Sequence, residues 1–258
     1  MLALISPAKS LDFETPALTP LRTEPALTAD TEALMKVLRK KSSGQIKKLM
    51  SLSDALAELN HERFQSFEAE PSPEVTRQAI LAFSGDTYKE MELEGLDDAG
   101  WARVQSQIRI LSGLYGVLRP LDAIQPYRLE MGTKLETRRG ANLYAFWGER
   151  IAKELNAHIA EAGATHVINC ASNEYFKAAK SAELDAPVVT PVFKDFKKGE
   201  YKVISFYAKR ARGAMAAHIA RRGLTSPEEL ASFDHGGYAW DEESSTEESP
   251  VFLRRLEG

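Results

Sequence analysis

The amino-acid sequence predicts an α+β fold, with a mixed β-sheet surrounded by helices over residues 1–258, and a mixed-sheet α/β fold is the alternative. Three observations predict it. Segments with helical and with strand-like apolar spacing mix throughout the chain. Two apolar runs near residues 188–206 flank Lys197-Lys198-Gly199, which predicts an antiparallel hairpin. The 258 residues are 43% hydrophobic, and neither a repeat nor a long linker divides them, so we expect one sizeable core.

The first half of the chain is predicted to contain strands, several helices and an irregular segment. Leu2–Ile5 is a short apolar run that Ser6-Pro7 ends, so we expect a buried strand there. Three prolines within residues 11–27 remove backbone donors and favour an irregular crossing. The other expected elements are helices over 30–67 with breaks at 42–44 and 52–53, a strand over 80–83 and a helix over 97–111.

The second half begins with a predicted helix over Phe146–Ala162. Ile151, Leu155 and Ile159 repeat every four residues on this helix, and Gly163 follows as a C-cap. The other expected elements are an extended segment over 127–131, a strand over 166–170, hairpin strands over 188–193 and 201–206, a helix over 208–221, a short helix opened by 225–228 and a strand over 251–253.

Charge is distributed unevenly along the chain. The formal net charge is -4, which by itself argues against a partner that is a polyanion. Residues 194–222, however, hold nine basic and two acidic side chains, and residues 103–139 hold seven basic and three acidic ones. Residues 228–249 hold eight acidic side chains and no Lys or Arg. The sequence therefore predicts two basic surfaces on an otherwise acidic protein, with an acidic run that is either solvated or competes with phosphate for the basic surface.

Targeting and redox features indicate the cytoplasm. The amino-terminal apolar stretch is short and lacks a basic region before it, so we interpret it as a strand rather than as a signal peptide. No apolar run is long enough to cross a bilayer, and no membrane partner is expected. The single cysteine, Cys170, fits a reducing compartment, and its place in a strand predicts a buried, inert thiol. We expect a monomer.

The sequence contains none of the common catalytic or metal-binding motifs. Its five histidines are scattered without metal-ligand spacing, and there is no C-x-x-C pair. There is also no P-loop, no G-x-G-x-x-G and no G-x-S-x-G elbow. We therefore predict no metal and no cofactor, and we find no catalase or peroxidase signature.

Six segments carry a resemblance to a known family. They are ISPAK (5–9), FSGDTY (83–88), LSGLYGVLRPLDAIQPYRLEMG (111–132), LYAFWG (143–148), INCASNEYFK (168–177) and ISFYAKRARG (204–213). They are spread over residues 5–213 in family order, and the sequence resembles the YaaA family of peroxide stress resistance proteins. The resemblance implies a compact domain of unusual topology with a helix-hairpin-helix element. It also implies protection from hydrogen peroxide, DNA binding and a positively charged cleft.

The glycine-rich turn near residue 113 is the candidate for the helix-hairpin-helix. Gly113 and Gly116 flank Tyr115 after a predicted helix, and glycine lets a backbone approach a phosphate closely. Arg119 could add a direct phosphate contact, although Pro120 would delay the second helix. The alternative is a C-cap and tight turn with Tyr115 in the core.

Two further segments place polar groups after or within predicted strands. On an extended segment, Arg128 and Glu130 share a face and would either orient a phosphate or form an internal salt bridge. Asn169 lies near the end of the predicted strand over 166–170, and Lys177 lies beyond it on the next helix. These two residues are candidates for contacts with a base or phosphate, whereas Ser172 and Asn173 could simply cap that helix.

The strongest candidate for anion binding is the start of the helix near residue 208. Lys209, Arg210 and Arg212 place three cations there, although the helix dipole disfavours cations at this end. A bound polyanion would relieve the repulsion, and a solvated basic face is the alternative. Lys9, just after the first strand, could join the same cleft.

Three functions remain open at this point. The first is a non-enzymatic DNA-binding protein that protects DNA or assists its repair, and that binds duplex or branched DNA by backbone and shape rather than sequence. The second is an enzyme acting on a nucleobase or nucleotide. The third is a protein that limits free intracellular iron, although no iron-ligand constellation is recognisable. The candidate catalytic residues for the second are Asp86, Asp122, Tyr127, Glu130, Glu174 and Tyr207, together with Tyr88 and Lys177.

Overall fold

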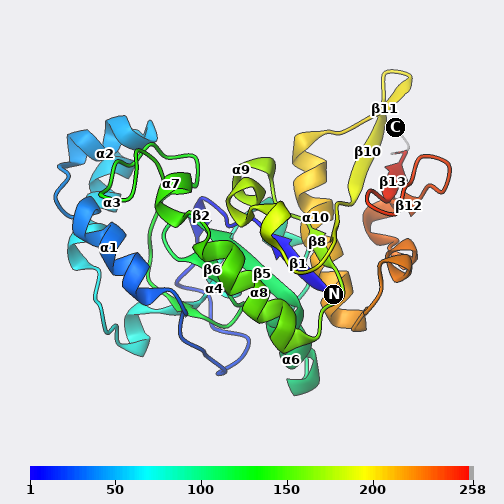
Figure 1. Cartoon of the computed structure of the whole chain (residues 1–258), viewed down its shortest axis with the longest axis horizontal. Helices are drawn as coiled ribbons and strands as arrows, with labels where there is room; N and C mark the ends of the chain where they lie inside the picture. Colours follow the sequence, from blue (N-terminus) through cyan, green and yellow to red (C-terminus); the bar gives the residue numbers. More distant parts are fainter. Residues whose placement is uncertain (256–258) are drawn as a thin grey trace.

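A five-stranded sheet forms the centre of the computed structural model, which describes residues 1–255 (Figure 1). Its strand order is β6-β5-β1-β8-β9. β1 pairs in parallel with β5 and β8, β8 pairs in parallel with β9, and only β6 runs antiparallel to its neighbour. The strands span Leu2–Ile5 (β1), Ile108–Ser112 (β5), Gly116–Leu118 (β6), Val167–Asn169 (β8) and Val188–Val189 (β9). Every residue of β1 is buried, as expected for a central strand.

Helices surround this sheet. α10 (Ser205–Arg222) and α6 (Asp98–Gln107) pack against β1, and α8 (Arg150–Ala162) packs against β6. The helices α1 (Thr28–Leu38), α2 (Ser43–Met50) and α3 (Asp54–Ser66) gather at one end of the molecule (Figure 1). The mixture of a largely parallel sheet, helices and short antiparallel pairs confirms the predicted α+β class.

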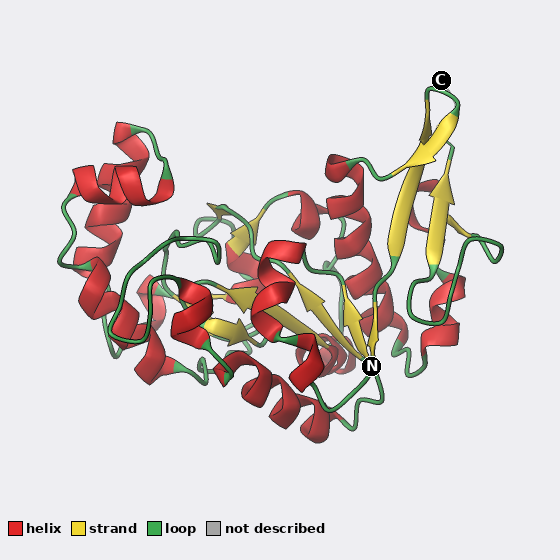
Figure 2. Cartoon of the chain, turned by 45° about the horizontal axis from the view of Figure 1, so that its top comes forward, coloured by secondary structure: helices red, strands yellow, loops and turns green. Residues whose placement is uncertain are grey.

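A second sheet lies at the other end of the molecule, and its β10–β11 hairpin projects from the body (Figures 1 and 2). Its order is β11-β10-β13-β12. The strands span Val192–Lys197 (β10), Glu200–Lys202 (β11), Ala239–Trp240 (β12) and Val251–Arg254 (β13). β10 is antiparallel to β11 and parallel to β13, so the predicted hairpin is confirmed.

Short elements complete the chain between these sheets. Two small antiparallel pairs join β2 to β4 and β3 to β7. The short strands are Ser10–Leu11 (β2), Arg77–Gln78 (β3), Phe83–Ser84 (β4) and Ala123–Ile124 (β7). The short helices are Ala79–Ala82 (α4), Asp86–Lys89 (α5), Leu143–Trp147 (α7) and Asn173–Phe176 (α9), with 3₁₀ turns over Pro73–Val75, Lys177–Ala179, Ser181–Glu183, Pro227–Ser232 and His235–Gly237.

Several predicted boundaries are wrong. The strand predicted over residues 80–83 is a single helical turn, α4, followed by the short strand β4. The helix predicted over 97–111 ends at Gln107, and the apolar residues after it form β5. Over a run as short as residues 108–111, a helix and a buried strand have the same pattern of apolar residues. The segment forms a strand because it pairs with β1.

Glycine and hairpin geometry shift three other boundaries. Gly148, with a φ of 53°, separates α7 from α8, where one continuous helix was predicted. β11 ends at Lys202 rather than at Phe206, and α10 begins at Ser205, three residues before the predicted start. The predicted stops of the two long helices are confirmed, since Gly163 and Gly223 both adopt left-handed C-cap conformations.

The residues predicted to form a helix-hairpin-helix form a strand–turn–strand instead. Ser112 pairs with Gly116 at the end of the antiparallel β5–β6 ladder. Leu114 and Tyr115 are buried in the core. An added Cβ on Gly113 would lie 2.2 Å from the carbonyl oxygen of Leu129, so this glycine permits close backbone packing inside the protein. Of the alternative, the tight turn with Tyr115 in the core is confirmed, whereas the C-cap is wrong, because β5 rather than a helix precedes Gly113.

Candidate functional site

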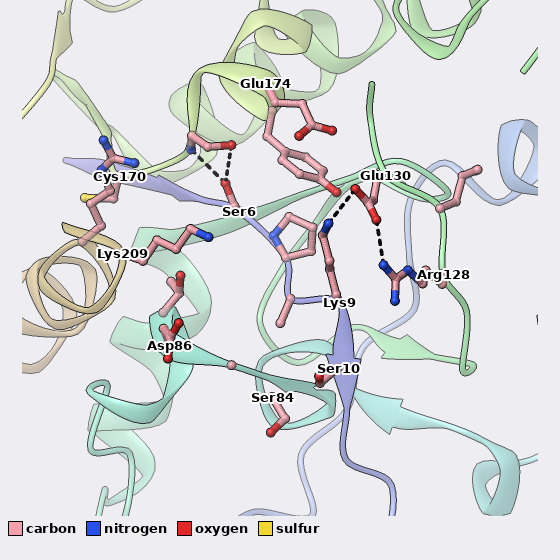
Figure 3. Close-up of a pocket in the computed structure, with 18 of the residues that line it drawn as sticks. Ser6, Lys9, Ser10, Ser84, Asp86, Arg128, Glu130, Cys170, Glu174 and Lys209 are labelled. Carbon is pink, nitrogen blue, oxygen red and sulfur yellow. Dashed lines mark hydrogen bonds and ion pairs between the residues drawn. The ribbon is translucent and has the colours of Figure 1, made fainter. Parts of the chain in front are cut away.

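A pocket of about 400 Å³ opens beyond the carboxyl ends of β1 and β8 (Figure 3). Ligand sites in sheets with parallel strands commonly lie at this edge, next to a strand whose two neighbours are reached by different crossovers. β1 is such a strand, because the chain reaches β5 on one side of it and β8 on the other. Five segments form the walls: residues 6–10, 84–87, 127–130, 170–175 and the first turns of α10.

Hydrogen bonds hold three of these segments together. The backbone N–H of Ser172 donates to Oγ of Ser6 at 2.8 Å, and the Ser6 hydroxyl donates to Oγ of Ser172 at 3.3 Å. The hydroxyl of Tyr88 donates to the carbonyl oxygen of Ser6 at 2.9 Å. These contacts link the segments that follow β1, β8 and β4, so the pocket wall is built into the fold.

Two of the predicted cations share one carboxylate on the pocket wall. Lys9 Nζ lies 3.0 Å from Oε2 of Glu130, and a guanidinium nitrogen of Arg128 lies 3.1 Å from Oε1 of Glu130 (Figure 3). Nε of Arg128 is buried and has no hydrogen-bond partner among the described residues. Buried donors nearly always have a partner, so this nitrogen is an unsatisfied donor in the pocket wall.

Two more cations come from α10. Lys209 and Arg212 are three residues apart on this helix and both line the pocket. The helix can approach because Gly213 has no side chain: an added Cβ would lie 1.7 Å from the carbonyl oxygen of Thr87. Gly213 therefore sets the distance between these cations and the loop of residues 84–87 on the facing wall.

The pocket also holds carboxylates and aromatic rings. Asp86 begins α5 and has no hydrogen-bond or ion-pair partner within residues 1–255 (Figure 3). Glu174 accepts a hydrogen bond from the backbone N–H of Gly132 at 2.8 Å through one oxygen. Burial raises the pKa of both Tyr127 and Tyr175, so their hydroxyls stay protonated, and the Tyr127 hydroxyl lies 2.6 Å from that of Ser112.

The balance of charge in the pocket is only slightly positive. Four cations and three carboxylates line it, so one net positive charge remains. Many cations of the two basic stretches are instead paired elsewhere. Arg210 pairs with Glu90, and Arg221 pairs with Glu92. The net charge of the cleft is therefore less positive than the basic stretches of the sequence predict.

Several predicted nucleic-acid contacts lie outside the pocket. Gly113, Tyr115 and Gly116 are buried in the β5–β6 turn, where they cannot reach DNA. Arg119 forms an ion pair with the buried Asp122 at 3.2 Å and donates to the carbonyl oxygen of Glu24. These residues stabilise the core and its edge rather than a ligand site.

Three more candidates point elsewhere. Asn169 is buried, with its amide bonded to Thr190 and to the backbone of Ala171. The ammonium of Lys177 lies 5.0 Å from the centre of the Tyr144 ring, and Lys177 does not line the pocket. Arg210 faces the other side of α10, toward Glu90.

Two of the candidate catalytic residues have structural contacts instead. The buried carboxylate of Asp122 accepts hydrogen bonds from Thr23 and from the backbone N–H of Arg119, and burial raises its pKa. The guanidinium of Arg254 lies 4.6 Å from the centre of the Tyr207 ring. Asp86, Tyr127, Glu130 and Glu174 are the candidates that the pocket brings together.

Cys170 lines the pocket but is 2% exposed. Burial raises the pKa of its thiol to about 12, so the reactive thiolate is scarce at neutral pH. Within residues 1–255 no group of three or more His, Cys, Asp or Glu side chains is arranged to hold a metal ion. No helix in this range is long and apolar enough to span a membrane.

Sequence reasoning missed the hydroxyl groups of the pocket. Ser6, Ser10, Ser84 and Thr87 all line it. Their positions in the sequence could have indicated a site, since Ser6 directly follows the first strand and Ser84 follows an apolar run. Serine and threonine are so common in turns that this signal alone did not separate them from ordinary loop residues.

The acidic run near the carboxyl terminus does not reach this pocket. Glu242 and Glu247 line a separate cavity next to His166 and Pro250. The backbone N–H of Thr190 donates to the carbonyl oxygen of Glu248, which fixes the run beside the start of β10. Competition with phosphate inside the pocket therefore has no geometric support.

The fold and pocket define a class of protein: a mixed α+β domain with a small polar site at the carboxyl edge of its central strands. The sequence profile described as "Peroxide stress protein YaaA" matches residues 1–244. A UPF0246 protein of Janthinobacterium sp. (strain Marseille) is 50% identical to this chain over 256 residues, which are 99% of both sequences. One of Ruegeria pomeroyi is 51% identical over 259 residues and covers 100% of both. One from Shewanella sp. (strain W3-18-1) is 49% identical over 257 residues and covers 100% of both. The chain belongs to the peroxide stress protein YaaA family.

Proposed function

We propose that this peroxide stress protein binds DNA, with a backbone phosphate held in the pocket between Lys9, Arg128, Lys209 and Arg212. The observation that carries the proposal is the convergence of these four cations, from three distant segments of the chain, on one hollow. Phosphate contacts of this kind position DNA without reading its sequence. Protection or repair of DNA under peroxide stress would follow from such binding.

The unpaired donor of Arg128 supports a bound anion. Its buried Nε has no acceptor among the described residues, while its terminal nitrogen already contacts Glu130. A phosphate oxygen would satisfy that donor, and guanidinium groups match phosphate geometry well. Lys9 is 65% exposed and shares the same carboxylate, so it can turn to a phosphate at little energetic cost.

The size of the pocket limits what can enter it. About 400 Å³ lies at the low end of small-molecule sites, which suits one nucleotide rather than a whole duplex. We therefore expect the backbone of an unpaired, branched or extruded segment to enter the pocket, while neighbouring phosphates contact its rim. This geometry favours distorted over regular duplex DNA.

The test is a comparison of DNA affinity between wild type and the double variant Lys209→Ala/Arg212→Ala. Each lost phosphate contact should lower the slope of log affinity against log salt by about 1. We expect a fall in affinity for branched DNA of roughly tenfold or more at low salt, measured by fluorescence anisotropy over a salt series.

Arg222→Ala is the matched control, because Arg222 lies at the far end of the same helix and outside the pocket. It should leave both affinity and salt slope unchanged. Equal behaviour of the double variant and wild type, in affinity and in slope, would rule out the pocket as the phosphate site.

An enzymatic role is a second candidate, favoured by the free carboxylate of Asp86. This side chain has no partner among the described residues and faces the same hollow as Glu130, Glu174 and Lys209. A carboxylate so placed can take a proton from water or from a substrate hydroxyl. A nucleotide bound through its phosphate would hold its base or sugar within reach of such a group.

The enzymatic candidate is tested with Asp86→Asn, which keeps the shape of the side chain and removes its charge. Wild type and variant are incubated with nucleotides and with oligonucleotides that carry damaged bases, and the products are identified by mass spectrometry. A wild-type product that the variant forms at least about 100-fold more slowly, at unchanged DNA affinity, supports catalysis. Absence of any product from the wild type, with binding intact, would leave the protein as a binder.

A further inference from the structure

The second sheet carries an outward face that the core does not explain. In the ladder of this sheet, Phe196 lies opposite Tyr201, and Lys194 lies opposite Leu253. Directly opposed residues share a face of a sheet, and residues two apart on a strand share it too. Phe196, Tyr201, Lys194 and Leu253 therefore lie together on what we call the outer face.

Around Phe193, the inner face of the same sheet packs against the body of the protein. Phe193 stacks on Phe252 at 5.3 Å between ring centres, and β10 packs against α10. Asp195 is buried and accepts a hydrogen bond from Nε of Arg254 at 2.7 Å. The aromatic residues on this side form the core between the sheet and the body of the protein. Core packing therefore does not explain the aromatic rings on the outer face.

The outer face exposes its aromatic rings. Tyr201 is 41% exposed, and its ring meets Phe196 edge to face at 5.2 Å. Val203 continues the alternation beyond β11 and is 52% exposed. The guanidinium of Arg255 lies 4.0 Å from the centre of the Phe196 ring. Phe196 and Tyr201 lie next to the turn of the β10–β11 hairpin, which projects from the body of the protein (Figure 1).

Cations dominate around these rings. Lys198 lies in the hairpin turn, and Lys194 and Arg255 lie beside the rings. The two carboxylates within β10 and β11 are neutralised, since Asp195 faces inward and Glu200 lies 2.8 Å from Lys202. The acidic run sits at the opposite end of the strands, beside Thr190. The outer face is therefore complementary to an anion that also carries flat rings.

We infer that the outer face of the β10–β11–β13 sheet is a docking surface for single-stranded DNA, with bases stacked on Tyr201 and Phe196 and phosphates on Lys194, Lys198 and Arg255. Exposed aromatics on a basic sheet are the usual platform for unpaired bases, since every base has a stacking face. The bases of a regular duplex are already stacked on each other and cannot use it. The inference deepens the proposed function, because it names unpaired strands as the partner and adds a second contact surface.

The experiment measures binding of a fluorescent oligothymidylate of about 20 nucleotides, and of the matching duplex, by anisotropy. Tyr201→Ala should weaken single-strand binding roughly tenfold and leave duplex binding nearly unchanged. Tyr201→Phe keeps the ring and should bind as wild type. Trp240→Ala is the matched control, because Trp240 is similarly exposed but lies opposite Phe252, on the inner side of the same sheet.

The outcomes separate this inference from the pocket proposal. Wild-type affinity of Tyr201→Ala for the single strand overturns the inference, and so does a change of oligomeric state without a change in DNA affinity. If Lys194→Ala also leaves the salt dependence of DNA affinity unchanged, the proposed phosphate contacts of the outer face are contradicted as well. Loss of binding in Tyr201→Ala but not in Lys209→Ala/Arg212→Ala would support the outer face and overturn the pocket. A wild-type protein that binds no DNA overturns both.

Discussion

Neighbouring side chains of α10 have different roles that sequence alone does not separate. Lys209 lines the pocket, whereas Arg210, the next residue, turns to Glu90 on the other side of the helix. The dipole argument applied equally to both, because both are cations near a helix start. Only the position of the partner carboxylate, 120 residues away in sequence, distinguishes them. Paired and available cations therefore could not be told apart from the sequence.

A buried histidine should make the protein sensitive to acid. His158 is 5% exposed, and burial followed by the charges of Arg109 and Arg119 lowers its pKa to about 3, although Glu154 lies 3.3 Å away. In the unfolded chain its pKa is near 6.5, so only the unfolded state takes up a proton as pH falls below that value. Stability should therefore fall between about pH 6.5 and 4.5, by roughly 2 kcal/mol from this residue.

The measurement compares His158→Gln with wild type by urea unfolding at both pH values. The variant lacks the titrating group, so it should lose less stability on acidification. Carboxylates that titrate in this range affect both proteins equally and cancel in the comparison. Parallel pH profiles of the two proteins would show that His158 is protonated in the folded state as well.

At the scale of elements, two close approaches place the pocket walls. Because Gly113 has no side chain, the β5–β6 turn packs closely against the backbone of Leu129. Leu129 lies between Arg128 and Glu130 of the pocket wall. Gly213 brings α10 against the backbone of Thr87. Both glycines lie in segments that carry the family resemblance, and the sequence interpretation assigned the first to phosphate binding. In both cases the partner is the protein's own backbone.

Gly213→Ala should therefore destabilise the protein. Alanine normally favours a helix over glycine by about 1 kcal/mol, but here the new Cβ would overlap a carbonyl oxygen that belongs to the backbone. We expect a net loss of roughly 1–3 kcal/mol in the free energy of unfolding and weaker DNA binding, because α10 must move away with Lys209 and Arg212.

Gly44→Ala in α2 is the control, since its added Cβ would meet nothing closer than 4.0 Å. It should be neutral or slightly stabilising by thermal and urea unfolding. Stability of Gly213→Ala equal to that of Gly44→Ala would mean that α10 and α5 separate freely, and the pocket walls would then not be fixed by this contact.

Across the whole molecule, the sequence predicted what depends on local pattern. Elements with strong local signals were found, such as the capped helix α3 and the hairpin with Gly199 in its turn. The order of strands in the central sheet was not predicted, because β1, β5 and β8 lie far apart in sequence and nothing local states which will pair. For the same reason, the charges of Lys9, Arg128 and Lys209 suggested a shared cleft, but only the strand order brings these residues together.

The position of β1 at the centre of the sheet has a consequence for synthesis of the chain. This strand leaves the ribosome well before its partners Ile108–Ser112 and Val167–Asn169. Until then, four consecutive apolar residues that end up fully buried remain without ladder partners. A nascent chain that has not yet reached Asn169 therefore cannot complete this sheet, and its first strand stays prone to aggregation until then.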